Sequence, residues 1–401
     1  MYLMYKSKEN IIFVFLAFFC LSGYGQFYSQ ENTNEAKNMA AIINSFTFLE
    51  LYKSDKNIIP EGYKKRFTSG IFGMDNKYQI YQTTTKAVIN LRGSTTKKIS
   101  WMENIYSSMI PAKGKIKLED ETFFYEFSDD KNAGVHAGYA LGIAFLAPDV
   151  INNIKSLNYD GIYDITITGH SQGGALAILL RAYLENLPKD VISEKNTFKT
   201  YAFAHPKVGN NEFVTSYTNS LKKGTNYSII NVKDFIPKMP LSSSEHKKMT
   251  TSESLSRLFL DKSFTAKDAA MGTLGKIFGG SFTSVMKYTS ESALKQITKK
   301  TGNITMPEYI TDVNYVVMEN RIELPEFDYP KILKDSEILK NDSLVTYHKM
   351  NENGVFEDET VYKNAPTLFQ HKTYNYYTAF LKKYYPKDYD NLELKHLPEN
   401  L

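Results

Sequence analysis

Ser171 stands in a G-x-S-x-G motif whose flanking residues favour a nucleophilic serine. A β-branched strand candidate, residues 162–168, runs directly into Gly169-His170-Ser171-Gln172-Gly173. Apolar residues at helical spacing then continue to Leu187, and Pro188 ends the pattern. A serine in a sharp strand-to-helix turn exposes its hydroxyl, and the residues two before and two after it must then be small. This context predicts a nucleophile elbow, whereas the motif alone would equally suit a serine that caps a helix.

Such a serine needs a histidine that takes its proton and a carboxylate that orients the histidine. Asp234 follows the strand candidate 227–232 and has the position expected of the carboxylate. His371 is the best-framed base, because an apolar helical face follows it, as expected of a loop histidine before a closing helix. Three other histidines follow Asp234 and stay open as alternatives: His246, His348 and His396.

Two aimed donors are also needed for the oxyanion that forms during acyl transfer. The backbone N–H of Gln172, the residue after the serine, is the first candidate. Ser94 is the second, because it offers a backbone N–H and a hydroxyl in the polar loop after the strand candidate 86–91. A simple turn serine is the alternative for Ser94.

The elements that must carry these residues alternate between strand and helix. We predict helices at 35–53, at 135–154 and after the serine motif, and strands at 77–82, 86–91, 162–168, 198–204 and 227–232. This alternation predicts an α/β fold, with a mostly parallel sheet flanked by helices and its chemistry at the carboxyl ends of the strands. Four polar residues lie just past such ends: Ser94, Ser171, His205 and Asp234.

Residues 241–365 fit this alternation less well. Residues 272–300 carry apolar side chains on one helical face, and we expect an amphipathic helix pair packed on the core rather than a mobile lid. Residues 344–349 and 354–362 are predicted to form the strands of an added hairpin. Residues 324–330 are predicted to form a loop.

The N-terminus has the pattern of a secretory signal. A short basic region precedes the apolar run 11–19, which is too short to span a bilayer, and small residues precede a cleavage site after Gly25. Residues 1–25 are therefore expected to be a signal peptide, and the protein is expected to be secreted or periplasmic. Cys20 is the only cysteine, and a lipid anchor on it is less favoured because two bulky phenylalanines precede it.

Length and charge limit the remaining possibilities. The chain has 401 residues and a formal net charge of +4, with no basic stripe that interleaves with aromatic residues. These features argue against nucleic acid as the main partner. Residues 26–401 are long enough for one large domain with a substantial core.

Five segments together resemble the class 3, fungal-type lipase family of the α/β-hydrolases: VINLRGS (88–94), VHAGY (135–139), ITGHSQGGALA (167–177), YAFAHPKVGN (201–210) and VKDFIPKMP (232–240). The resemblance implies an α/β-hydrolase fold that needs no cofactor or metal. It implies Ser171 as nucleophile, Asp234 as orienting carboxylate and His371 as base. It also implies an oxyanion hole formed by Ser94 and Gln172.

Three departures from the family pattern matter. His205 stands where the family commonly has Gln or another polar residue before Pro, and it is a candidate for lining the site. Gln172 stands where the family usually has Leu, although the expected donor is a backbone N–H and is unaffected. The long separation between Asp234 and His371 implies an insertion between them, at about 241–365.

The implied activity is that of a secreted serine carboxylic ester hydrolase, which cleaves acyl esters, acylglycerol lipids first among them, through an acyl-enzyme. The implied partners are the ester or lipid substrate and, transiently, a lipid interface. The alternatives are a phospholipase, a short-chain esterase, and, from another class, a secreted binding protein without catalysis. The sequence does not predict the oligomeric state.

Overall fold

The computed structural model describes most of the chain after the expected signal peptide: residue 27 and residues 29–222, 224–240, 282–311, 314–319, 321–366 and 368–398. The predicted signal peptide, residues 1–25, lies outside the described residues, as do residues 241–281 of the predicted insertion. None of the described helices combines the length and apolar character that crossing a bilayer requires.

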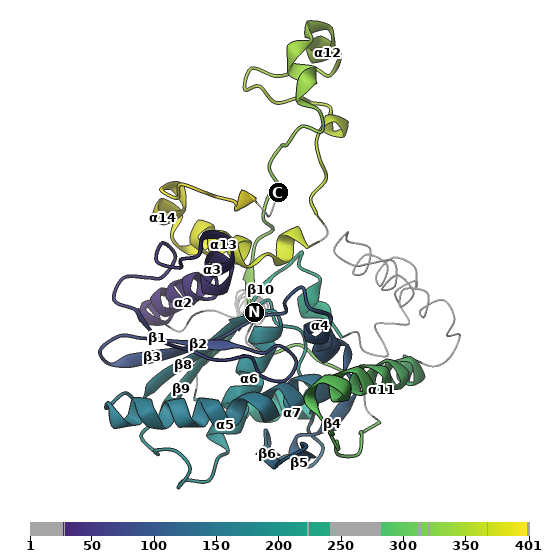
Figure 1. Cartoon of the computed structure of the whole chain (residues 1–401). Helices are drawn as coiled ribbons and strands as arrows, with labels where there is room; N and C mark the ends of the chain where they lie inside the picture. Colours follow the sequence, from purple (N-terminus) through teal and green to yellow (C-terminus); the bar gives the residue numbers. More distant parts are fainter. Residues whose placement is uncertain are drawn as a thin grey trace, which may run out of the picture.

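A seven-stranded sheet forms the centre of the molecule, in the order β1-β2-β3-β8-β9-β10-β11 (Figure 1). The first two strands, β1 (Lys64–Thr68) and β2 (Tyr78–Gln82), form an antiparallel edge. The other five strands are mutually parallel: β3 (Lys86–Leu91), β8 (Asp164–His170), β9 (Thr197–Phe203), β10 (Asn226–Asn231) and β11 (Arg321–Leu324). The predicted fold class, a mostly parallel sheet flanked by helices, is confirmed.

Helices cover both faces of this sheet. On one face, α5 (Ala137–Tyr159) and α6 (Gln172–Glu185) pack over Ile89 and Ile167. On the other face, α2 (Gln30–Ile42) and α13 (Thr373–Tyr384) pack over Val88 and Tyr201. Successive strand residues point to opposite faces, so a strand covered on both sides can carry apolar residues at successive positions, as Val88 and Ile89 do.

Shorter elements complete the body of the molecule. The helices are α3 (Ser45–Tyr52), α4 (Lys98–Ile105), α7 (Asn211–Ser220), α11 (Phe282–Thr301) and α14 (Pro386–Asp390), with single 3-10 turns η1 (Ile236–Lys238) and η4 (Phe369–His371). The strands are β4 (Met109–Pro111) with β7 (Gly134–His136), and β5 (Lys113–Lys117) with β6 (Thr122–Glu126). The helix α11 packs against α4 and buries Ala293 and Ile297, as expected of a core-packed amphipathic helix.

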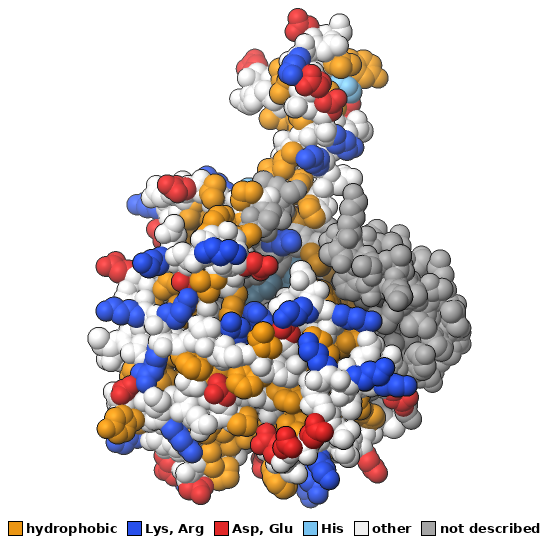
Figure 2. All heavy atoms as spheres, in the orientation of Figure 1, with side chains coloured by type: hydrophobic (Ala, Val, Ile, Leu, Met, Phe, Trp, Pro, Cys, Tyr) orange, Lys and Arg blue, Asp and Glu red, His pale blue; other side chains and the backbone are white. Residues whose placement is uncertain are grey.

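Residues 331–366, which we call the arm, project from the body of the molecule (Figure 1). The arm contains η2 (Ser336–Lys340), α12 (Asp342–Tyr347) and η3 (Glu359–Val361). It has a small apolar core of its own around Phe356 and Tyr362. Figure 2 shows it as a lobe on which apolar, acidic and basic side chains are mixed.

Two predictions about local structure were wrong. The helix expected at 35–53 is interrupted after α2, where the buried Asn44 donates its side-chain amide to the carbonyl of Ala40 at 2.9 Å and closes a turn. The hairpin expected at 344–349 and 354–362 does not form. A single antiparallel bridge, between Met350 and Phe356, joins this part of the described arm. Asn341 instead caps α12 by accepting from the N–H groups of Ser343 and Leu344, and this local bond favours a helix.

A buried carboxylate, Glu35, fastens α2 to the sheet. One oxygen accepts from Lys199 Nζ at 2.8 Å and from the Tyr201 hydroxyl at 3.0 Å. The other accepts from the Thr166 hydroxyl at 2.9 Å. A buried charge is tolerated when it is paired and hydrogen-bonded in this way, and it fixes the position of the helix over β8 and β9.

We expect Glu35→Ala to lower the free energy of unfolding by about 2–4 kcal/mol, because it strands a lysine and two hydroxyls. Urea denaturation measures the change. The matched control is Lys37→Ala, also on α2, which breaks an exposed ion pair with Asp388 of α14 and should cost about 1 kcal/mol or less. Equal effects of the two substitutions would contradict the anchoring role of Glu35.

Candidate active site

Ser171 lies at the turn between β8 and α6, at the carboxyl edge of the sheet. Its backbone has φ 58° and ψ −127°, a left-handed conformation that an L-residue adopts only under strain. A Cβ on Gly173 would lie 2.2 Å from the carbonyl oxygen of Leu91, and a Cβ on Gly169 would lie 2.3 Å from that of Gly173. Both glycines of the motif are therefore required by close backbone contacts, as the sequence predicted.

The three side chains singled out from the sequence lie in one hydrogen-bonded line. His371 Nε2 is 2.9 Å from Ser171 Oγ, and His371 Nδ1 donates to Asp234 Oδ2 at 2.7 Å. Asp234 follows β10 and is buried, whereas His371 lies in η4, just before α13. With Nδ1 donating to the carboxylate, Nε2 is free to accept the proton of the serine hydroxyl.

Two further donors hold the Asp234 carboxylate. The Tyr376 hydroxyl donates to Oδ2 at 2.7 Å, and the backbone N–H of Ile236 donates to Oδ1 at 3.0 Å. Burial, followed by the charge of Asp234, raises the pKa of Tyr376 well above its ordinary value, so the hydroxyl stays a donor. The sequence analysis missed Tyr376, because its contact with Asp234 joins residues that are far apart in the chain.

A second histidine, His170, packs beside His371 with ring centroids 4.7 Å apart. Burial, followed by the nearby His371, lowers the pKa of His170 well below its ordinary value. His170 is therefore neutral, and it places no fixed positive charge beside the imidazole that contacts Ser171.

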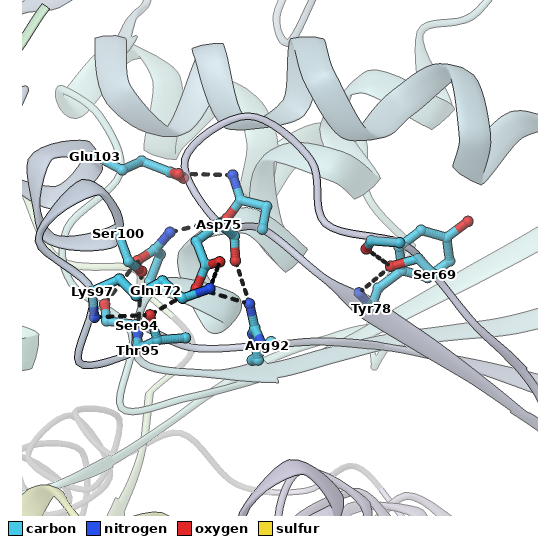
Figure 3. Close-up of polar contacts among 12 residues, drawn as sticks. Ser69, Asp75, Tyr78, Arg92, Ser94, Thr95, Lys97, Ser100, Glu103 and Gln172 are labelled. Carbon is cyan, nitrogen blue, oxygen red and sulfur yellow. Dashed lines mark hydrogen bonds and ion pairs between the residues drawn. The ribbon is translucent and has the colours of Figure 1, made fainter. Parts of the chain in front are cut away.

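Ser94 lies in the loop after β3, next to the turn that carries Ser171. A Cβ on the preceding Gly93 would lie 3.6 Å from the Cβ of Ser171. The Ser94 hydroxyl donates to Gln172 Oε1 at 2.7 Å (Figure 3). It also accepts from Asn104 Nδ2 at 2.9 Å. Among the described residues, none accepts from the backbone N–H of Ser94 or Gln172.

Asp75 holds the same loop from the other side (Figure 3). Its carboxylate accepts from Arg92 at 3.1 Å, from the Thr95 hydroxyl at 2.8 Å and from Lys97 at 2.6 Å. Burial would raise the pKa of Asp75, but the bonds from Lys97 and Thr95 outweigh it and hold the pKa below its ordinary value. The loop that carries Ser94 is therefore tied down by an ionised carboxylate.

Comparison with known proteins identifies lipases as similar proteins. Residues 88–244 match the family model described as lipase (class 3). A curated relative, secreted mono- and diacylglycerol lipase 1 of Fusarium solani, is 28% identical over 139 residues, which are 33% of this chain and 39% of the relative. The predicted resemblance to class 3 lipases is confirmed. The match covers well under half of the relative's length.

Solved lipase structures are also similar. The lipase of Rhizopus microsporus var. chinensis is 20% identical, with 54% of this chain and 71% of that chain covered and a TM-score of 0.40. The triacylglyceride lipase of Rhizomucor miehei is 17% identical, with 54% and 77% covered and a TM-score of 0.40.

Among the described residues, no histidine other than His371 is hydrogen-bonded to the Ser171 side chain. His348 lies in the arm, where its Nδ1 is 2.7 Å from Asp358. His396 packs against Phe327. His205 is buried and accepts from the Ser228 hydroxyl at 2.6 Å, and burial lowers its pKa to about 4. His246 is outside the described residues.

A buried carboxyl, Glu103, lies behind the lipase-like site. Its Oε2 accepts from Asn76 Nδ2 at 2.7 Å, and its Oε1 has no hydrogen-bond partner among the described residues. Burial raises the pKa of Glu103 to about 8, because an ionised form would stand in an apolar environment with few donors. At neutral pH this group is therefore mostly protonated in the folded protein.

We expect Glu103→Gln to stabilise the protein increasingly as pH rises from 5 to 8. The unfolded chain releases the Glu103 proton near the ordinary value of 4.5, whereas the folded chain keeps it up to about 8. Between these values the wild type loses about 1.4 kcal/mol of stability per pH unit from this group, and the amide does not. Urea denaturation at several pH values measures the difference.

The matched control is Glu61→Gln at an exposed position. A stability difference between the Glu103→Gln and Glu61→Gln variants that stays constant from pH 5 to 8 would contradict a buried, protonated carboxyl.

Proposed function

We propose that this protein is a serine carboxylic ester hydrolase of the lipase type, with Ser171 as nucleophile, His371 as base and Asp234 as orienting carboxylate. The observation that carries the proposal is the pair of distances at His371, 2.9 Å to the Ser171 hydroxyl and 2.7 Å to the Asp234 carboxylate. The class 3 family match over residues 88–244 supports the same activity.

In the proposed reaction, His371 Nε2 takes the proton of the Ser171 hydroxyl as Oγ attacks the acyl carbonyl carbon. The backbone N–H groups of Gln172 and Ser94 stabilise the resulting oxyanion. The intermediate collapses as the alcohol leaves with the proton from His371, and Ser171 becomes acylated. Water then attacks the acyl-enzyme with the same proton transfers and releases the carboxylic acid.

Acylglycerol lipids are the proposed substrates. The matched Fusarium relative is named as a mono- and diacylglycerol lipase, and it is also named as secreted. That name, together with the sequence pattern of residues 1–25, supports export of this protein. A transient contact with a lipid interface belongs to the same proposal.

Substitution of the nucleophile is the first test. We expect Ser171→Ala to abolish hydrolysis of p-nitrophenyl esters and labelling by a fluorophosphonate, while circular dichroism and the melting temperature show a folded protein. The reason is that the hydroxyl proposed to carry the acyl group is then missing. Full activity of the variant would refute the mechanism, and failure of well-folded wild type to react with the probe would favour a non-catalytic binding protein.

Histidine variants identify the base. We expect His371→Ala to lower kcat by about 10⁴-fold or more, because the serine loses its proton acceptor. His348→Ala, which removes a histidine of the arm, is the matched control and should keep wild-type kcat. His246→Ala tests the alternative base that the sequence left open. Loss of activity in that variant, with His371→Ala active, would reassign the base.

Substrate class is tested by a hydrolysis profile over p-nitrophenyl esters of increasing chain length, with mono- and diacylglycerol emulsions and a phospholipid control. We expect activity to rise with acyl length and to extend to the emulsions, because apolar acyl chains gain binding energy on burial. A preference for short soluble esters would indicate an esterase instead. Equal or faster phospholipid cleavage would indicate a phospholipase.

A further inference from the structure

The side chain of Gln172 makes a set of contacts that the proposed reaction does not use. Its Oε1 accepts from the Ser94 hydroxyl at 2.7 Å, from Asn104 Nδ2 at 3.1 Å and from the Ser100 hydroxyl at 3.3 Å. Its Nε2 donates to Asn76 Oδ1 at 3.0 Å. The side chain is almost completely buried, so every polar atom of the amide is satisfied within the protein.

Behind Gln172, a chain of bonds fixes which way its amide points. Asn76 donates to the Glu103 carboxyl, so its own oxygen faces Gln172 and can only accept from Nε2. The Tyr139 hydroxyl donates to Asn104 Oδ1 at 3.0 Å, so the Asn104 amide nitrogen faces Ser94 and Gln172. These bonds orient the Gln172 amide so that its Oε1 accepts from Ser94, in the loop after β3 (Figure 3).

The Ser94 hydroxyl therefore has a hydrogen-bond partner both as donor and as acceptor. Its proton goes to Gln172 Oε1, and its oxygen accepts from Asn104. The hydroxyl therefore serves as a tether between the loop and α6, and the backbone N–H of Ser94 remains available to an oxyanion. Asp75 secures the remainder of the loop through Thr95 and Lys97.

We propose that the Gln172 side chain is a positioning residue, which locks the Ser94 loop against the elbow and so holds the two oxyanion-hole N–H groups in place before substrate binds. This inference rests on the proposed function. A donor preset at the correct distance costs no reorganisation during the reaction, whereas a loop free to move by about 1 Å can lose about 100-fold in rate. One residue thus supplies a donor through its backbone and positions the other through its side chain.

The test uses Gln172→Met, which keeps length and volume and removes the amide, in the full exported chain. We expect kcat on p-nitrophenyl butyrate to fall about 10- to 100-fold while KM changes less than about threefold. The Ki of an alkyl boronic acid, which adds to the serine and places an oxygen in the oxyanion hole, should rise by a similar factor. Gln30→Met, at an exposed position, is the matched control for the substitution and should keep wild-type values.

A double-mutant cycle with Ser94→Ala separates the tether from direct catalysis by the hydroxyl. If Gln172 acts through that hydroxyl, Ser94→Ala and Gln172→Met each lower kcat to a similar extent, and the double variant is no worse than either. Rescue by Ser94→Thr, which keeps a hydroxyl, should occur with Gln172 present and fail in Gln172→Met. Multiplicative losses would overturn the proposal and assign the Ser94 hydroxyl directly to the oxyanion.

The outcomes distinguish this inference from the proposed function. If wild type hydrolyses esters, Ser171→Ala does not and Gln172→Met keeps wild-type kcat and Ki, then only the positioning role is wrong. If wild type neither hydrolyses esters nor reacts with a fluorophosphonate, the proposed function itself is wrong. Melting temperatures of all variants exclude loss of fold as the cause of a lower kcat.

Discussion

The close approach of the β8–α6 turn to the end of β3 is the constraint on which the site depends. The Ser171 backbone is left-handed, and the close packing of the chain around the turn holds this strained conformation in place. A side chain on Gly173 would collide with the Leu91 carbonyl, so the elbow and the loop after β3 are pressed together backbone to backbone. The same contact brings Ser94 beside Ser171. The proposed nucleophile and the proposed oxyanion donors are therefore positioned by one packing arrangement.

The residues around this contact are held by buried hydrogen bonds and ion pairs rather than by apolar packing alone. Asp75 holds the loop with charged partners, and Gln172 holds it with neutral amides and hydroxyls. Glu103 ends the neutral network as a protonated carboxyl. A network in which almost every buried polar group is paired fixes a single geometry, because any shift leaves a further group unpaired. The one unpaired oxygen of Glu103 is the point at which the network costs stability.

Local pattern explains what the sequence could predict. The strand, glycine-flanked serine and helix around Ser171 are contiguous, and the strand ends that carry Ser94 and Asp234 follow from chain order in a parallel sheet. Contacts between residues that are far apart in the chain produce no comparable pattern in the sequence. Tyr376 meets Asp234 because α13 packs on the same face of the sheet as α2, and Glu103 is joined to Gln172 through Asn76. The hairpin expected in the arm failed for a local reason, since capping by Asn341 outweighed an alternating pattern.

The sequence separation of 137 between Asp234 and His371 is no obstacle to the site, because the entropy cost of closing a loop rises only with the logarithm of its length. What matters is that the far end is held firmly. The helix α13 packs against α2 and β11, and Tyr376 on that helix bonds both to Asp234 and to the backbone N–H of Asn231. The helix α13, which follows His371, is thus also bonded to the end of β10, after which Asp234 lies. Additions such as the arm can therefore lie between the two residues without changing the distance between them.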